Sequence, residues 1–436
     1  MAQRQANPIR AGLTSLLSPQ LIRRRAAALG TIKRRRKIDP VALVYTLVLG
    51  FERGRERSLA CLRRAYISAT GTTLAASAFY ERFTPELAEL MRHLCDQALV
   101  KLGRSGGKLQ GILANFSKVF IADGSLVRLH DALAAHFPSV WTNHTKASAK
   151  LHLTIDGATR TPQIVRIVPG SRHDASLLEP GPWCRDSLLL ADLAYYDGKL
   201  FQRILAHGGH FLCRVKSDAN FLICGASDPS WVGRRHRALV AASSGRSFDV
   251  QIEHVYRHTR DRDWTKRRLQ LRLIGLWHHD AQQHRIYITS ASSELLAAET
   301  AAAVYAMRWE IELLFRELKR QLCIDDMPSG NLAATEVLLY AALLALAFGR
   351  NLERVLTSSQ NQQPIRMCTT ERWTTVLRAL APMLLSLLVG PRDHRSYLER
   401  RILLTLRWEA PDPNRKRLSL RERAAAGVLR QAAVAP

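Results

Sequence analysis

Two aspartates, Asp123 and Asp192, each follow a run of apolar residues at the point where the sequence predicts the end of a buried strand. In open α/β sheets, ligand sites gather at such strand ends. An ionised carboxylate there suits a hard cation, because Mg²⁺ takes oxygen ligands and is commonly held by one or two carboxylates. For either residue alone, a simpler interpretation is favoured: Asp123 belongs to an Asp-Gly turn and Asp192 caps a turn. A metal site therefore requires further groups.

A third acidic residue, Glu312, lies in the segment 305–319, whose composition strongly favours a helix. At 3.6 residues per turn, the apolar side chains of this segment fill one sector that would pack on a sheet. Only Glu312 falls at the edge of that sector, whereas Glu310 and Glu317 point elsewhere. Glu312 is therefore the acid of this helix that we expect to take part in a site.

Three further polar residues share the stripe of Glu312. Tyr305, Arg308 and Lys319 fall with it inside a sector roughly 60° wide on an ideal helix. A salt bridge from Arg308 to Glu312 at i,i+4 spacing explains one pair but neither Tyr305 nor Lys319. A phosphate site explains all four, with Glu312 binding a metal ion and the other three binding phosphate oxygens. We therefore favour a phosphate site.

The segments around the two aspartates predict an α/β layer. Apolar and alternating runs predict strands, and Asp156-Gly157 between two of them predicts a hairpin. The order strand, hairpin, strand, helix, strand indicates a mixed sheet. The predicted strands are 118–124, 150–157, 163–168, 187–192 and 210–216, with a helix at 198–207.

The flanking regions have a different texture. Residues 218–285 contain alternating stretches that predict a β-rich insertion, and helical patterns dominate before residue 110 and after residue 298. Two short helices at 59–64 and 75–83 flank a Gly-containing turn and could form a helix-turn-helix reader. An ordinary helical bundle is the favoured interpretation of these two.

The charge balance indicates a polyanionic partner. The chain has 64 Lys and Arg against 37 Asp and Glu, a formal net charge of +27. Such a surface attracts nucleic acid, an anionic membrane face or acidic polymers. Nucleic acid is favoured, because we find no basic amphipathic anchor with aromatic residues.

The remaining composition favours a soluble protein of a reducing compartment. Seven cysteines without a C-x-x-C pair argue against a disulfide framework and a zinc site, which indicates a cytoplasmic location. The N-terminal residues lack the apolar core of a signal peptide. The longest apolar stretch, 337–348, is shorter than the about twenty residues that span a bilayer, so we expect a buried helix and no membrane partner.

These residues resemble a known family, the DDE-type insertion-sequence transposases of the branch with the YREK signature. The blocks Ile-Ala-Asp-Gly-Ser around Asp123 and Asp-Leu-Ala-Tyr-Tyr from Asp192 match the style of the family, and the resemblance covers about residues 115–350. The signature positions are Tyr305, Arg308, Glu312 and Lys319.

The resemblance implies a ribonuclease H-like catalytic core with a mixed sheet, interrupted by a β-rich insertion before the glutamate. It implies Asp123, Asp192 and Glu312 as ligands of two Mg²⁺ or Mn²⁺ ions. It implies that Tyr305, Arg308 and Lys319 contact the DNA end. The expected reaction is cleavage at transposon ends followed by strand transfer, with double-stranded terminal inverted repeats and target DNA as substrates and at least two protomers, in the simplest case a homodimer, in the synaptic complex.

The resemblance also suggests a division of the chain into five segments. The terminal segments carry no signature, so their roles follow by analogy. The segments are a helical basic DNA-binding region at 1–110, the first part of the core at 111–217, the insertion at 218–285, the second part of the core at 286–350, and a helical basic region for DNA contact or dimerisation at 351–436.

Alternatives remain at this stage. A ribonuclease H-like nuclease that never joins strands would not need the Tyr-Arg-Lys stripe, and an idle DNA-binding descendant of a transposase would not need three acids. Arg214 and Lys216 could face DNA or be solvated edge charges, and the sequence favours neither. His173 and Asp174 could assist at the metal, although a helix cap is favoured.

Overall fold

The computed structural model describes most of the chain. The described residues are 8–31, 38–50, 58–104, 109–140, 145–257, 266–325, 327, 329–358, 367–414 and 418–428.

One mixed sheet forms the centre of the described structure. Strands β1, β2 and β3 are antiparallel neighbours, whereas β4 and β5 run parallel to β1 on its other side. This order and these directions are those of a ribonuclease H-like core, and the predicted fold class is confirmed. The bounds are β1 (Val119–Arg128), β2 (Ser148–Asp156), β3 (Thr161–Pro169), β4 (Leu188–Ala191) and β5 (His210–Arg214).

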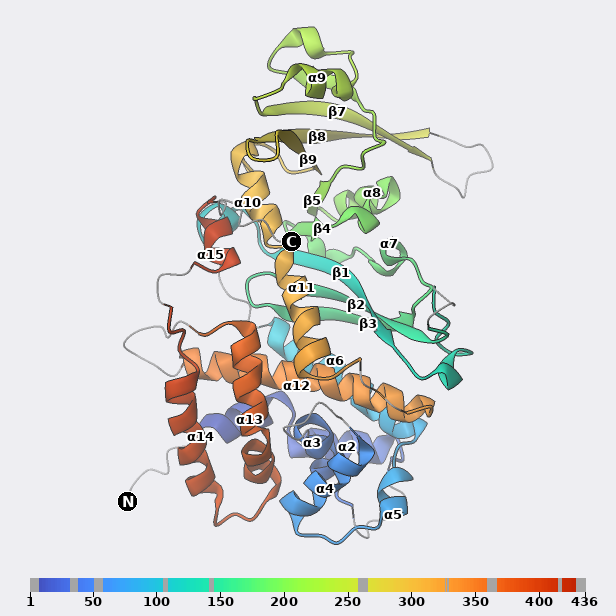
Figure 1. Cartoon of the computed structure of the whole chain (residues 1–436), viewed down its shortest axis with the longest axis vertical. Coiled ribbons are helices and arrows are strands. Elements are labelled where there is room, and N and C mark those ends of the chain that lie inside the picture. Colours follow the sequence, from blue (N-terminus) through green and yellow to red (C-terminus); the bar gives the residue numbers. More distant parts are fainter. Residues whose placement is uncertain are drawn as a thin grey trace.

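The β-rich part of the chain continues this same sheet. Strand β9 pairs antiparallel with β5, and β8, β7 and β6 follow in that order, which makes nine strands in the described part. Figure 1 shows these strands at one end of the molecule and the helical regions at the other. The bounds are β6 (Leu222–Ala226), β7 (Phe248–Arg257), β8 (Lys266–His278) and β9 (Gln283–Thr289), with helix α9 (His236–Ala242) beside them.

Side chains on the two faces of the sheet enter two separate hydrophobic clusters. Along β1, Val119 and Ile121 join the cluster shared with the long helices, whereas Phe120 and Ala122 join the cluster under α8 (Gly198–Ala206). This alternation is the period of two that a strand imposes. Hydrophobic side chains therefore cover both faces of the core sheet.

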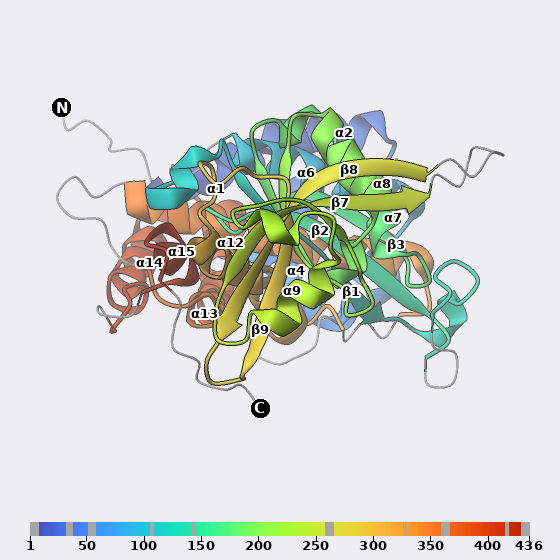
Figure 2. The same cartoon turned by 90° about the horizontal axis from the view of Figure 1, so that it is seen from above.

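Helices surround the core at both chain ends. Several begin at a Ser, Thr or Asp cap followed by Pro, as at Ser18, Asp39 and Thr84. The N-terminal helices are α1 (Pro8–Leu16), α2 (Pro19–Ala28), α3 (Pro40–Leu49), α4 (Leu59–Thr70), α5 (Ala76–Tyr80) and α6 (Pro85–Gly103). The C-terminal helices are α12 (Leu332–Ser358), α13 (Thr370–Val389), α14 (Arg395–Glu409) and α15 (Leu420–Ala425). Seen from above, α13, α14 and α15 lie on the side away from α8 (Figure 2).

The apolar stretch 337–348 lies inside α12, which has 27 residues and is longer than predicted. Two described helices are long and apolar enough to cross a membrane, α12 and α13, with 83% and 56% of their apolar windows buried inside the protein. The burial of α12 confirms the predicted core helix.

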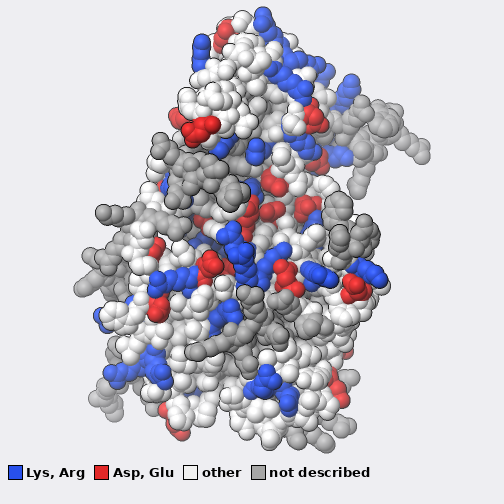
Figure 3. Space-filling view, in the orientation of Figure 1, with Lys and Arg blue, Asp and Glu red and all other residues white. Residues whose placement is uncertain are grey.

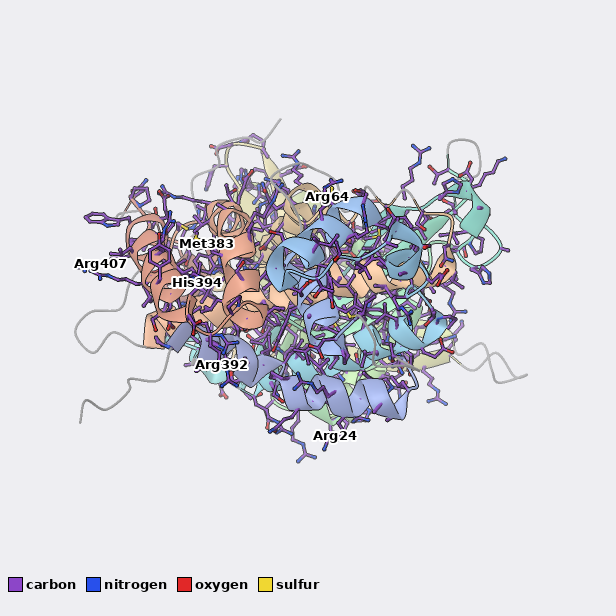
Figure 4. All side chains as sticks on the ribbon, turned by 90° about the horizontal axis from the view of Figure 1, so that it is seen from below. Arg24, Arg64, Met383, Arg392, His394 and Arg407 are labelled. Atoms are coloured by element: carbon purple, nitrogen blue, oxygen red, sulfur yellow. The ribbon has the colours of Figure 1, made fainter. Side chains whose placement is uncertain are left out.

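Basic side chains are spread over the helical end of the molecule. Figure 4 shows on this face Arg24 on α2, Arg64 on α4, Arg407 on α14 and Arg392 in the connection between α13 and α14. All four are exposed. This surface can attract a polyanion at long range but does not by itself define a site.

Candidate active site

Asp123 does not lie at the end of its strand, so this part of the sequence prediction was wrong. Strand β1 continues to Arg128 because β2 pairs with it along its whole length, and Asp123 is opposite Leu153. The parallel pairing with β4, in contrast, stops at Ile121. Asp123 therefore lies where β1 loses its β4 neighbour. The prediction for Asp192 is confirmed: it follows β4 and accepts a hydrogen bond from the amide of Ala194 at 2.8 Å.

The strand register sets the two aspartates side by side. Val119 is opposite Leu188 and Ile121 is opposite Leu190, so the same register two residues further places Asp123 opposite Asp192. Alternation along both strands directs both side chains to the face that carries the larger hydrophobic cluster. The two carboxylates therefore share one edge and one face of the sheet.

The electrostatics of Asp123 reflect this closeness. Burial and, second to it, the negative charge of Asp192 together raise the pKa of Asp123 to about 7. Its Oδ1 accepts the amide hydrogen of Gly124 at 2.8 Å, and an Arg308 nitrogen lies 3.8 Å from its Oδ2. A second positive charge at this point would relieve the repulsion between the carboxylates.

The pKa of Asp123 predicts a pH-dependent stability in the metal-free protein. Below about pH 4 the carboxyl is protonated in both folded and unfolded chains, and it imposes no penalty. As pH rises to about 7 the unfolded chain ionises first, so the folded state loses stability. We expect Asp123→Asn to gain stability over the natural protein on the order of 2–4 kcal/mol between about pH 4 and pH 8. Urea unfolding in EDTA at several pH values measures this gain, and a pH-independent difference would contradict it.

The sequence predicts one regular helix over residues 305–319, and the structure contradicts this prediction. Helix α10 (Ala301–Ala306) ends before Arg308, α11 (Trp309–Arg316) follows, and a π-helical turn covers Glu317–Gln321. A π-turn holds more residues than an α-turn, so side chains beyond it no longer follow the 3.6-residue phase. Side chains on the stripe before residue 317 therefore keep their predicted direction. Side chains after residue 317 are rotated away from the stripe.

Glu312 and Tyr305 join the aspartates through specific contacts. The Arg308 guanidinium forms an ion pair with Glu312 and also approaches Asp123, so it lies between these two carboxylates. The Tyr305 hydroxyl donates to the carbonyl of Ala191 at 3.3 Å, directly before Asp192. Tyr305, Arg308 and Glu312 thus gather where the predicted stripe would place them.

Lys319 does not join this cluster. Its Nζ donates to the carbonyl of Leu126 on β1 at 2.6 Å and lies 3.7 Å from Asp325. The π-turn that contains Lys319 explains the displacement, because it rotates this side chain toward the far part of β1. The structure therefore brings together five of the six predicted residues and separates Lys319 from them.

The three acids are gathered but do not form a ready metal cage. In the part of the chain that the structure describes, no three His, Cys, Asp or Glu side chains lie close enough together to hold a metal ion. Asp123 and Asp192 are neighbours, and Glu312 is joined to them by the intervening guanidinium of Arg308. In Figure 3, acidic side chains gather at the level of β1 and β4, with Lys and Arg around them.

Glu310 and Glu317 turn into the core of the protein. Glu317 is buried, forms an ion pair with the buried Arg350 and accepts a hydrogen bond from the hydroxyl of Thr374. Glu310 is also buried, and burial raises its pKa. These two acids stabilise the packing of the helical layers, and the sequence prediction that they lie off the site stripe is confirmed.

A fourth carboxylate, that of Asp174, lies near Asp123, a closeness that the sequence did not favour. Asp174 is the first residue of α7 (Asp174–Leu177), and its Oδ2 accepts a hydrogen bond from Lys150 at 2.8 Å. Its Oδ1 lies against Gly124, where an added Cβ would come within 2.1 Å of it. The charge of Asp174 also raises the pKa of Asp123. His173 takes the N-cap position of α7, as the sequence favoured, although its side chain makes no cap hydrogen bond, and Asp174 follows it in the first turn.

A fully buried imidazole stands behind the aspartates. His152 on β2 is opposite Gly124, and burial lowers its pKa to about 4, so it is neutral at physiological pH. Neither of its ring nitrogens has a hydrogen-bond partner among the described residues. The signal in the sequence was the alternation of polar residues, among them Lys150 and His152, with apolar ones along β2.

Known proteins resemble this chain over most of its length. The family model described as the transposase DDE domain matches residues 114–348, more than half of the chain. The transposase of the insertion sequence element IS231F from Bacillus thuringiensis subsp. israelensis is 20% identical over 394 residues, which cover 79% of each chain. The transposase of IS1151 from Clostridium perfringens is 23% identical over 312 residues, 63% of this chain and 65% of that protein.

A solved structure is also similar. The piggyBac transposase synaptic complex with hairpin DNA aligns with 94% of this chain and 87% of that chain, at 10% identity and a TM-score of 0.49. The family match, in contrast, spans the two aspartates, the β-rich strands and the helix that carries Glu312. The chain belongs to the transposase DDE domain family and is a DDE transposase of the kind that insertion sequences encode.

Proposed function

We propose that this transposase cuts transposon ends and joins them to target DNA with Asp123, Asp192 and Glu312 as the ligands of divalent metal ions. The observation that carries the proposal is the closeness of Asp123 and Asp192: the β1–β4 register, extended by two residues, brings them together, and the charge of Asp192 raises the pKa of Asp123. The ion pair between Arg308 and Glu312 supports the same assignment, because it holds the third acid beside the other two. We also propose that this transposase belongs to the branch of the family with the YREK signature.

The side chains present fit Mg²⁺ or Mn²⁺. Two adjacent carboxylates, one with a pKa raised to about 7, form a site in which a cation relieves both repulsion and burial. A pair of such ions, when bound, supplies a water nucleophile at neutral pH and neutralises charge at the scissile phosphate. Glu312 would complete the ligand set, and the Arg308 guanidinium that pairs with it in the absence of metal would then bind a phosphate of the substrate.

The neighbouring polar groups would orient the DNA end. Arg308 offers a planar guanidinium that can bind two phosphate oxygens at once. Tyr305 is fixed against Ala191 by its hydroxyl, so its ring holds the turn that begins at Asp192. Lys319, whose ammonium reaches the far part of β1 from the π-helical turn, would contact a phosphate further along the same strand of DNA.

The remaining parts of the proposal concern the whole assembly. We assign end recognition to the helical basic region 1–110 and DNA contact or dimerisation to 351–436. Residues 111–217 and 286–350 would form the two parts of the core around the insertion 218–285. The substrates would be double-stranded terminal inverted repeats and target DNA, bound by a homodimer in the cytoplasm.

Strand transfer is the reaction that separates this proposal from its rivals. Incubation of the protein with a labelled terminal-repeat duplex, a supercoiled target plasmid and Mg²⁺ should give joined products in which the label is covalently linked to the plasmid. Nicked duplex without joined product would indicate a ribonuclease H-like nuclease. Bound but uncut duplex would indicate a DNA-binding protein without catalysis. Either of these results would overturn the proposed reaction.

A further inference from the structure

A hollow of about 1160 Å³ lies beside Asp192 on the face of the sheet opposite to α11. One wall is the outer face of α8, whose residues Lys199 and Arg203 project opposite to the buried Leu200 and Ile204. We call this space the cationic hollow. Its lining includes Leu193, Ala194, Tyr196, Lys199, Arg203, Lys216 and Arg267.

Positive charge dominates this lining. The four basic residues come from three separate elements, since Lys199 and Arg203 lie on α8, Lys216 follows β5 and Arg267 lies on β8. The single acid in the lining, Asp197, already accepts a hydrogen bond from the amide of Lys199 at 2.9 Å as the cap of α8. Four cations from separate segments of the chain thus line one hollow.

Two of these cations are available to an external anion. Arg203 and Lys216 are exposed, and neither forms an ion pair with an acid among the residues that the structure describes. The Lys216 ammonium lies 5.3 Å from the centre of the Tyr196 ring, and Arg203 donates to the carbonyl of Leu178 at 3.4 Å. These contacts orient the two side chains without neutralising them.

The position of the hollow relates it to the proposed reaction. Leu193 and Ala194, at its edge, follow Asp192 directly in the chain. A second hollow of about 590 Å³ shares Tyr196, Asp197 and Lys216 with the first and extends toward β7 of the β-rich strands. Because the acids Asp218 and Glu253 line the second hollow, the excess of positive charge lies in the first.

We propose that the cationic hollow binds the sugar–phosphate backbone of duplex DNA where the duplex continues past the scissile phosphate. The cationic hollow is far larger than one phosphate group and carries four Lys and Arg side chains against one acid, which fits a polyanion and not a small apolar ligand. Phosphate contacts of this kind are independent of base sequence. The inference rests on the proposed function, because it takes Asp192 as the place of cleavage.

The double variant Arg203→Ala, Lys216→Ala tests this inference. Binding of a 30-base-pair duplex of unrelated sequence should weaken ~10–60-fold at about 0.1 M salt, and the slope of log K against log salt should become shallower by about 2. The same loss should appear with a terminal-repeat duplex. Fluorescence anisotropy at four salt concentrations with full-length protein gives both quantities, and the thermal midpoint shows that the variant is folded.

The matched control is Arg246→Ala, Arg285→Ala. These arginines are exposed and line neither hollow, and their removal changes the net charge by the same amount. The control should lose less than about twofold in affinity, as expected for screened charges remote from the ligand. Equal losses in the two double variants, or no loss in either, would overturn the proposal. A loss of affinity for heparin with unchanged affinity for the duplex would also overturn the proposal.

Failure of the hollow and failure of the proposed function give different results. If Asp192→Asn still cleaves DNA, the metal assignment fails whatever the salt slopes show. If Asp192→Asn is inactive but the hollow variant binds DNA as tightly as the natural protein, only the hollow proposal fails.

Discussion

Replacing Asp192 by Asn is expected to lower the rate of end cleavage by about 10³–10⁴-fold, because several kcal/mol of metal-dependent charge stabilisation would be lost. The substitution keeps the shape of the side chain and its hydrogen bond to the amide of Ala194. It removes the charge that faces Asp123. Duplex affinity without metal should change less than about threefold, because a carboxylate does not bind phosphate. A nicking assay with a labelled terminal-repeat duplex in Mg²⁺ measures the rate.

Asp228→Asn is the matched control for this prediction. Asp228 is an exposed acid that caps a short helical turn in the β-rich part of the chain, and Asn also serves as a cap. The control should cleave at the rate of the natural protein. Cleavage by Asp192→Asn within about tenfold of the natural rate would remove Asp192 from the metal site.

The second large effect concerns stability and not catalysis. Glu317→Ala should lower the free energy of unfolding by about 3–5 kcal/mol, because it leaves the Arg350 guanidinium buried without its partner. The two side chains are only 3% and 2% exposed, and Thr374 also donates to Glu317. Urea unfolding monitored by circular dichroism measures the loss.

A surface ion pair gives the comparison. In the pair of Arg166 and Glu179, the side chains are 35% and 61% exposed, so Glu179→Ala should cost less than about 1 kcal/mol. Replacing both Glu317 by Leu and Arg350 by Met should restore part of the stability, since no uncompensated charge remains. Equal losses for Glu317→Ala and Glu179→Ala would contradict the structural role assigned to the buried pair.

The sequence predicted the layout of the core because strands and turns are encoded locally. The hairpin at Asp156-Gly157 joins β2 to β3, and the helix predicted at 198–207 is α8. Period-two alternation identified β7 and β8. Sequence could not show that β9 pairs with β5, because pairing between distant strands depends on the whole sheet.

The sequence predicted which residues form the site better than it predicted how they are arranged. Asp192 lies at a strand end as expected, but Asp123 lies within β1, because pairing with β2 extends the strand past Asp-Gly. The ideal helical wheel placed Lys319 beside Glu312, and the π-turn from Glu317 moved it away. A helix that changes its hydrogen-bonding pattern cannot be recognised from side-chain periodicity alone.

The neighbours of the site were the least predictable part. Asp174 approaches Gly124 only because the chain after β3 turns back over β1, and no local pattern encodes that contact. The cationic hollow has the same origin, since Lys199, Lys216 and Arg267 come together only in the folded sheet. Lys216, whose orientation the sequence left open, lines both hollows, whereas Arg214 lines neither.

The central claim is that Asp123, Asp192 and Glu312 share bound divalent ions. Counting Mn²⁺ by electron paramagnetic resonance in the complex with a terminal-repeat duplex tests it most directly. The natural protein should bind about two ions per protomer, as expected for a two-metal phosphoryl-transfer site, and each of Asp123→Asn, Asp192→Asn and Glu312→Gln should bind fewer. Undiminished Mn²⁺ stoichiometry and affinity in all three variants would contradict the claim.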